Sequence, residues 1–166
     1  MFAVDRADWL ELVARVALAM AAGGVVGWNR QREGKPAGLR THVLVAIGAC
    51  LFTLAPQTAA TGASAEVVGR VIQGVAVGIG FLGAGEIFHR GPQPDGHGRI
   101  KGLTSAAAMW VTAAFGVVAG CGLWRLLLVA GTVVILVLTV MKRIERLFFA
   151  PENRESDDRP PESPTR

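Results

Sequence analysis

Five long apolar runs, separated by short polar connections, constrain the fold of this chain more than any other feature. They lie near residues 9–28, 41–60, 67–88, 103–121 and 123–141. Each run holds about 20 residues, the length that an α-helix needs to cross roughly 30 Å of hydrocarbon. The sequence therefore predicts an all-α, polytopic membrane protein with a bundle of about five transmembrane helices.

Glycine accounts for 21 of the 166 residues, which is well above the roughly 7% found in soluble proteins. Small residues are frequent where membrane helices approach each other closely. The third run carries glycines on more than one face, so we expect it to be the central, most crowded helix. The glycines expected to pack there are Gly74, Gly78, Gly80, Gly83 and Gly85.

The same run contains the pattern G-x-G-x-x-G within G-I-G-F-L-G-A-G. A dinucleotide-binding site would need this pattern between a strand and a helix of a βαβ unit. Inside an apolar run the pattern indicates close helix packing, and nucleotide binding is not expected.

Basic residues are distributed unevenly among the connections. The first connection carries Arg30, Arg32, Lys35 and Arg40, the third carries Arg90, Arg99 and Lys101, and Lys142, Arg143 and Arg146 follow the last run. The second connection has none and the fourth has only Arg125. Because basic loops stay in the cytoplasm, the N-terminus is predicted outside and the C-terminus inside. The basic excess is thus a topology signal, and a nucleic-acid surface is not expected.

Two regions follow from composition. Residues 1–150 form the predicted transmembrane domain, with the first run retained as a span rather than cleaved as a signal peptide. Residues 151–166 are rich in proline, acidic residues and arginine. A segment of this composition cannot bury an apolar core, so a disordered cytoplasmic tail is predicted.

Charged residues also occur within the runs. Glu11 precedes Arg15, and Glu66 precedes Arg70, by four positions. Such pairs share a helix face and are favourable. They are either neutralised side chains that reach toward the interface or an ion-sensing feature at the outer mouth. Glu86 near the inner end of the third run is either a carboxylate that reaches toward the interface or a cation contact.

The first connection ends with K-P-A-G-L-R-T-H, residues 35–42. Pro36 and Gly38 break the chain, and Thr41 is expected to cap the second helix. Lys35, Arg40 and His42 would then lie at a helix N-terminus that favours anions. They form either a site for an acidic group of a partner or lipid, or only a positive-inside anchor. K-G-L-T-S repeats the pattern with Lys101 and Thr104, which predicts a shared cytoplasmic surface.

Enzyme chemistry has no support in the sequence. His42, His89 and His97 match no metal-ligand spacing, and no serine or cysteine nucleophile stands beside a histidine and an acid in a recognisable pattern. No enzyme activity, cofactor or resident metal is therefore expected.

The chain resembles the MgtC/SapB family of bacterial inner-membrane proteins over about residues 10–141. The resemblance rests on K-P-A-G-L-R-T-H-V-L-V-A-I-G-A-C-L-F, on G-I-G-F-L-G-A-G and on K-G-L-T-S-A-A-A-M-W-V-T-A-A-F-G-V-V-A-G, in that order. It implies five spans, a link to growth in low magnesium, virulence in some members and restraint of the proton-driven ATP synthase. Two positions depart from the family pattern: Asn29 stands where an acidic residue usually precedes Arg30, and Glu86 follows the G-A-G string where a small or apolar residue is usual.

We therefore expect a multi-pass protein of the bacterial inner (plasma) membrane that binds or regulates membrane partners in magnesium homeostasis. The expected partners are the lipid bilayer, the ATP synthase or another membrane protein, and further copies of the chain. The alternative is a magnesium or other cation transporter, or a subunit of one.

Overall fold

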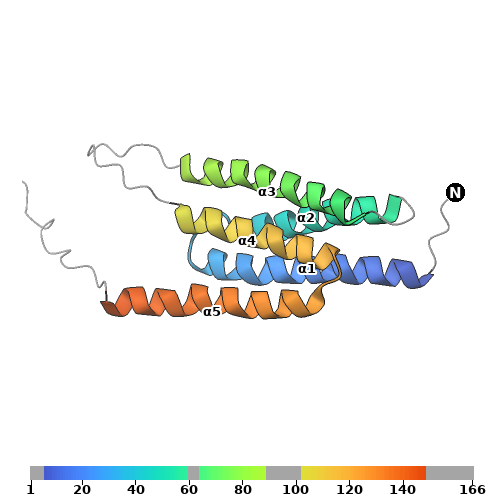
Figure 1. Cartoon of the computed structure of the whole chain (residues 1–166). Helices are drawn as coiled ribbons and strands as arrows, with labels where there is room; N and C mark the ends of the chain where they lie inside the picture. Colours follow the sequence, from blue (N-terminus) through green and yellow to red (C-terminus); the bar gives the residue numbers. More distant parts are fainter. Residues whose placement is uncertain (1–5, 60–63, 89–101, 149–166) are drawn as a thin grey trace, which may run out of the picture. The chain divides into compact units, whose positions relative to one another are not determined.

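The computed structural model describes residues 6–59, 64–88 and 102–148 (Figure 1). These residues form five α-helices and no strand: α1 (Arg6–Arg32), α2 (Leu39–Ala59), α3 (Ala65–Phe88), α4 (Leu103–Gly120) and α5 (Trp124–Phe148). Each helix includes a stretch long and apolar enough to cross a membrane. The predicted all-α class with five spans is confirmed. Lys101, His89, His97 and the predicted tail at 151–166 lie outside the described residues.

The chain divides into two units, Met1–Gly131 and Thr132–Arg166. The first unit contains α1 to α4 and the beginning of α5, and the bundle described below belongs to it. Of the second unit, the structure describes residues 132–148, which continue α5 as a largely exposed helix.

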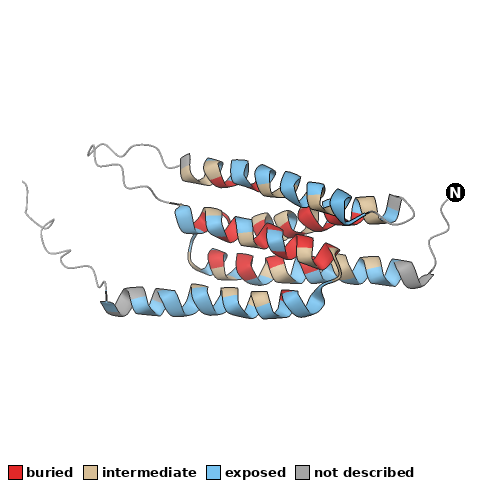
Figure 2. Cartoon of the chain, in the orientation of Figure 1, coloured by how far each residue is buried: buried red, intermediate tan, exposed pale blue. Residues whose placement is uncertain are grey.

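Helices α1, α2 and α4 pack against one another and enclose the core of the bundle (Figures 1 and 2). The core side chains are mostly small, which allows the helix axes to approach closely. They include Ala19, Val26, Ala46, Cys50, Ala108, Ala113 and Ala119. Helix α3 packs mainly on α4 and less on α2, through a patch that contains Ile79. Cys50 and Cys121 are free thiols.

The closest backbone approaches occur at two pairs of glycines spaced four residues apart. On α1, a Cβ added at Gly23 would lie 2.6 Å from the carbonyl oxygen of His42, and one at Gly27 would lie 2.7 Å from Cα of Leu39. On α4, a Cβ at Gly116 would meet the carbonyl oxygen of Ala46, and one at Gly120 would lie 2.8 Å from Cβ of Thr53. Both pairs press on α2.

The third run was expected to form the central, most crowded helix. Within a single chain, this expectation is wrong for α3. A Cβ added at Gly74, Gly78, Gly80 or Gly85 would meet nothing within 4 Å, and only Gly83 approaches a neighbour, Ala106 of α4 at 3.4 Å. The glycines do occupy several faces of α3, but most of these faces point away from the bundle (Figure 2). Glycine pattern alone does not distinguish a face that packs on its own chain from one that does not.

Tight turns join the helices at the two ends of the bundle. Gly34 between α1 and α2, and Gly122 between α4 and α5, have φ values of 65° and 72°, which favour glycine. The end that holds the C-terminus of α1 and the N-terminus of α2 is called the Arg30 end below. The opposite end, with the C-termini of α2 and α4, is called the Arg15 end.

Candidate functional site

Arg30 occupies the last turn of α1 and points into the bundle, where only 2% of the residue is exposed. Its Nη2 donates a hydrogen bond of 2.5 Å to Oγ of Ser105, a buried residue in the first turn of α4. Its Nη1 lies 3.7 Å from Oε2 of Glu33, just beyond the helix. The guanidinium therefore ties the end of α1 to the start of α4.

His42 lies in the first turn of α2 and is fully buried. Its Nδ1 lies 2.9 Å from the carbonyl oxygen of Gly38, so this nitrogen is assigned the proton that it donates. Nε2 is then an acceptor, and it is buried with no hydrogen-bond partner among the described residues.

Glu86 brings the carboxylate of α3 to the same end. Its Oε1 is buried and has no hydrogen-bond partner in the described part of the chain. The carboxylate interacts electrostatically with both Arg30 and His42. One residue from each of four helices thus takes part at this end, through the Arg30–Ser105 hydrogen bond and the electrostatic interactions of Arg30, His42 and Glu86. These four residues are called the Arg30 cluster.

The chemistry of the Arg30 cluster suits a buried polar contact between helices better than a magnesium site. Magnesium prefers octahedral oxygen ligands, whereas the carboxylates of Glu33 and Glu86 lie near a guanidinium that repels cations. Within the described residues, no group of three or more His, Cys, Asp or Glu could hold a metal ion. Glu86, where a cation contact was expected, interacts electrostatically with Arg30 and His42, and no ion pair joins it to either of them within the described residues.

The basic connection does not form the single cluster that the sequence indicated. Lys35 and Arg40 are exposed, whereas His42 is buried beneath them and turned toward Arg30. His42 is separated from them because it faces α1 one turn into the helix, where Gly23 and Gly27 allow α1 to approach closely. The exposed basic surface of the described chain at this end consists of Arg32, Lys35 and Arg40, with the Arg32 guanidinium 5.0 Å from the Trp28 ring centroid.

The predicted helix caps are also different. Helix α2 begins at Leu39, so Thr41 is inside it, and Oε1 of Gln31 accepts a hydrogen bond of 3.1 Å from N of Leu39. Helix α4 is preceded by Gly102 at φ 101°, with no side-chain cap. Thr104 is exposed. A glutamine from the preceding helix, rather than the hydroxyl of Thr41, accepts the hydrogen bond at the start of α2.

A second polar cluster lies at the Arg15 end. Nη1 of Arg15 donates to the carbonyl oxygen of Gly120 at 2.8 Å and to Oε1 of Gln57 at 3.4 Å. Nη2 of Arg15 pairs with Glu11. Arg15 thus joins α1 to the C-terminal ends of α2 and α4, where a cation interacts favourably with the helix dipole. Of the two alternatives for this residue, the structure favours neutralisation, through both Glu11 and the backbone.

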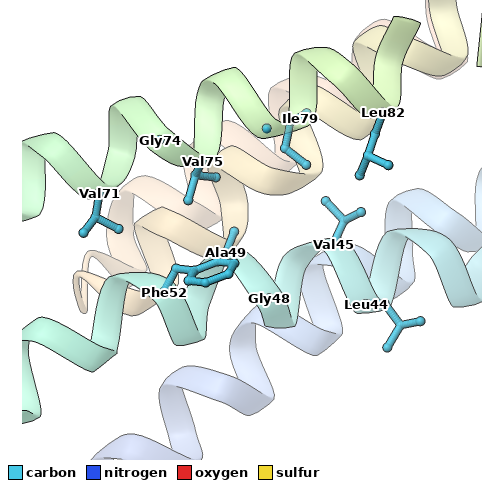
Figure 3. Close-up of a pocket in the computed structure, with 11 residues that line it drawn as sticks. Leu44, Val45, Gly48, Ala49, Phe52, Val71, Gly74, Val75, Ile79 and Leu82 are labelled. Carbon is cyan, nitrogen blue, oxygen red and sulfur yellow. The ribbon is translucent and has the colours of Figure 1, made fainter. Parts of the chain in front are cut away.

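An apolar groove of about 730 Å³ runs between α2 and α3 (Figure 3). Leu44, Val45 and Phe52 line it from α2, and Val71, Val75 and Leu82 line it from α3 (Figure 3). Gly48, Gly74 and Gly78 also line the groove, and there the wall is backbone without a side chain. Its composition suits lipid chains or an apolar helix, and it offers no polar ligand for an ion.

Sequence reasoning missed Ser105 as the partner of Arg30 and missed the two glycine pairs that bring α1 and α4 onto α2. The pairs could have been found, because Gly23–Gly27 and Gly116–Gly120 both have the G-x-x-x-G spacing typical of packed membrane helices. Gly74–Gly78 has the same spacing and does not pack within the chain, so the signal is not specific.

Comparisons with known proteins agree with this architecture. The sequence profile of the MgtC family matches residues 16–147. The chain is 46% identical to protein SrpB of Synechococcus elongatus over 157 residues, which cover 92% of this chain and 86% of SrpB. It is 40% identical to the putative magnesium transporter YhiD of Escherichia coli K12 over 139 residues, or 81% of this chain and 62% of YhiD.

Protein MgtC of Salmonella typhimurium is 36% identical over 143 residues, or 85% of this chain and 57% of MgtC. The chain thus spans about six tenths of the length of YhiD and MgtC. No solved structure matches. With five apolar helices and matches over most of its length, this chain belongs to the MgtC family.

Proposed function

We propose that this chain is a multi-pass protein of the bacterial inner membrane that supports magnesium homeostasis and adaptation to low magnesium by binding and regulating a membrane partner. Its N-terminus is outside and its C-terminus is in the cytoplasm. The exposed basic residues Arg32, Lys35 and Arg40 at the Arg30 end support this orientation. The name of the YhiD relative supports the link to magnesium.

The tightly packed core between α1, α2 and α4 supports a regulatory role rather than ion conduction. Gly116 and Gly120 press α4 onto the backbone of α2, which leaves no room for an ion there. Thr53 and Thr112 are the buried hydroxyls at mid-depth, and each donates at 2.8 Å to a carbonyl four residues earlier in its own helix. Closely packed small side chains of α2 and α4 thus separate the Arg30 cluster from the polar contacts of Arg15 at the opposite end.

The partner-binding surface is the exposed basic connection, and it takes an acidic group. Lys35 and Arg40 are exposed, and the backbone N of Lys35 donates to the carbonyl oxygen of Arg30 at 3.1 Å, which ties the connection to the end of α1. A carboxylate of a membrane complex or a lipid phosphate would fit this charge. The family resemblance makes the proton-driven ATP synthase one candidate for such a complex.

The test is rescue of growth in low magnesium in a strain that lacks its own family member. Arg40→Lys keeps the charge but removes the planar guanidinium fork. We expect Arg40→Lys and Lys35→Ala to reduce rescue while inserting normally, and the control Arg125→Lys at the opposite end to rescue fully. Full rescue by both Arg40→Lys and Lys35→Ala would leave these residues as a positive-inside anchor only.

Transport is the second candidate, and it is favoured by the similarity to the putative magnesium transporter YhiD. A carrier made of this chain would move magnesium when purified protein is placed in liposomes with a magnesium indicator inside. We expect influx equal to that of empty liposomes. Influx that saturates with magnesium and depends on the amount of protein would support transport and contradict the proposal.

A further inference from the structure

One face of α3 points away from the bundle and carries three polar side chains. Glu66, Arg70 and Gln73 are all exposed, and Val77 and Gly80 continue the same face toward the Arg30 end. The opposite side of the helix, which contains Ile79 and Gly83, packs on the chain. This outward face is formed by Glu66, Arg70, Gln73, Val77, Gly80 and Ala84, and is called the α3 seam.

The spacing of the α3 seam is that of a helix–helix contact. Its positions are separated by four, three, four, three and four residues. Hydrophobic and small residues at this 3.5-residue repeat keep one stripe facing a partner helix. At Gly80 an added Cβ would meet nothing within 4 Å, so a second backbone can come close there.

The polar side chain of Gln73 would be unfavourable if only lipid tails covered the α3 seam. It lies eight residues beyond the start of the span Ala65–Ile87, or about 12 Å along the helix axis, inside the hydrocarbon. Its side chain is exposed. Among the described residues, its amide has no hydrogen-bond partner. A bare amide in hydrocarbon is unfavourable, because lipid tails neither donate nor accept hydrogen bonds.

The charges of the seam are already paired within each chain. Nη2 of Arg70 lies 2.6 Å from Oε1 of Glu66, and these side chains are 76% and 73% exposed. In two parallel α3 helices, Arg70 of one copy lies at the same depth as Arg70 of the other, and the Glu66 carboxylate of each chain, one turn away, neutralises its own guanidinium there. Gln73 carries both a donor and an acceptor, so two copies at the same depth can bond to each other.

We propose that a second copy of this chain docks on the α3 seam and forms a parallel α3–α3 pair around a twofold axis along the membrane normal. Copies inserted in the same direction present identical residues at identical depths, which an isologous contact requires. Gln73 then sets the register, as a polar residue in an apolar seam does. The groove between α2 and α3 is off the seam and stays free.

Cysteine cross-linking of the full chain in native membranes tests this pairing. The background carries Cys50→Ala and Cys121→Ser, and single cysteines replace Val77, Gly80, Leu82 or Phe52. The last two are exposed but lie off the seam. We expect a disulfide-linked dimer for Val77→Cys and Gly80→Cys on mild oxidation, and little for the two controls. Equal cross-linking at all four positions, or stronger cross-linking at the controls, would overturn the proposal.

Dimerisation measured by energy transfer between labelled copies diluted in liposomes tests the part played by Gln73. Gln73→Leu removes the hydrogen bonds and keeps an apolar surface. We expect it to weaken association about threefold to tenfold, given the usual strength of such bonds in membranes. Leu82→Ala should leave association unchanged. Association of Gln73→Leu as strong as that of the parent chain would argue against a second copy as the occupant.

Discussion

Arg30 and Ser105 lie 75 positions apart in the sequence, yet Nη2 of Arg30 donates to Oγ of Ser105 at 2.5 Å. The bond joins the end of α1 to the beginning of α4, and Arg30 also interacts electrostatically with His42 and Glu86. A buried guanidinium needs acceptors around it, because its charge is costly to remove from water. This contact therefore fixes the relative positions of helices that are far apart in the chain.

Loss of Ser105 and loss of Arg30 should both destabilise the bundle, but to different extents. Ser105→Ala removes one acceptor, and we expect a loss of about 1–3 kcal/mol in the free energy of unfolding. Arg30→Met removes the cation beside Glu33 and Glu86 as well as the donor to Ser105, and we expect a larger loss of about 3–5 kcal/mol. Reversible unfolding in mixed micelles measures both, and the double variant should cost less than the sum of the two single changes.

Two matched glycine substitutions separate the packing surface of the bundle from the open face of α3. A Cβ at Gly116 would meet the carbonyl oxygen of Ala46 and Cβ of Ala49 at 2.9 Å, whereas one at Gly78 would meet nothing. We expect Gly116→Ala to destabilise the monomer by about 1–3 kcal/mol through overpacking. Gly78→Ala should be neutral or stabilising by up to about 1 kcal/mol, because alanine favours the helix.

Thermal unfolding of the two variants in detergent provides the comparison. Equal destabilisation would show that α3 is packed as tightly as α4, in agreement with the expectation from the glycine pattern and against the structure.

The sequence contained the number, class and approximate limits of the helices, because span length and hydropathy are set by the bilayer. It did not contain the arrangement of the helices. A face that packs on another helix and a face that does not are both apolar, so the Gly74–Gly78 pattern and the Gly116–Gly120 pattern look alike. Only the contacts show that the second pair is the one pressed against α2.

The Arg30 cluster was predictable only in part. Arg30, His42 and Glu86 each stood out as polar residues near span ends. Their convergence depends on which way each helix is turned, and a one-residue rotation of about 100° would separate them. Ser105 gave a misleading signal, since a hydroxyl near a helix start usually caps the helix rather than serving a distant arginine.

Membrane orientation is tested by accessibility of single cysteines in intact cells, in the background without Cys50 and Cys121. Ala65 lies at the Arg15 end and Lys35 at the Arg30 end, and both residues are exposed. If the basic connections are cytoplasmic, an impermeant maleimide should label Ala65→Cys and spare Lys35→Cys until the membrane is opened. Labelling of Lys35→Cys in intact cells would reverse the proposed orientation.

Arg15 and Gln57 both donate to the carbonyl oxygen of Gly120, at 2.8 Å and 3.3 Å, so each can partly replace the other. Glu11, by contrast, is largely exposed where it pairs with Arg15. We expect Glu11→Gln to change the free energy of unfolding by less than about 1 kcal/mol, as is usual for an exposed ion pair.

Single changes at the two donors should each cost about 1 kcal/mol, because one hydrogen bond to the carbonyl remains. The double variant Arg15→Leu/Gln57→Leu leaves the carbonyl of Gly120 without either donor. We expect its loss to exceed the sum of the single losses by about 1–2 kcal/mol, measured by reversible unfolding in mixed micelles. Additive losses would mean that the two side chains act independently and that the C-terminal end of α4 does not depend on their shared contact.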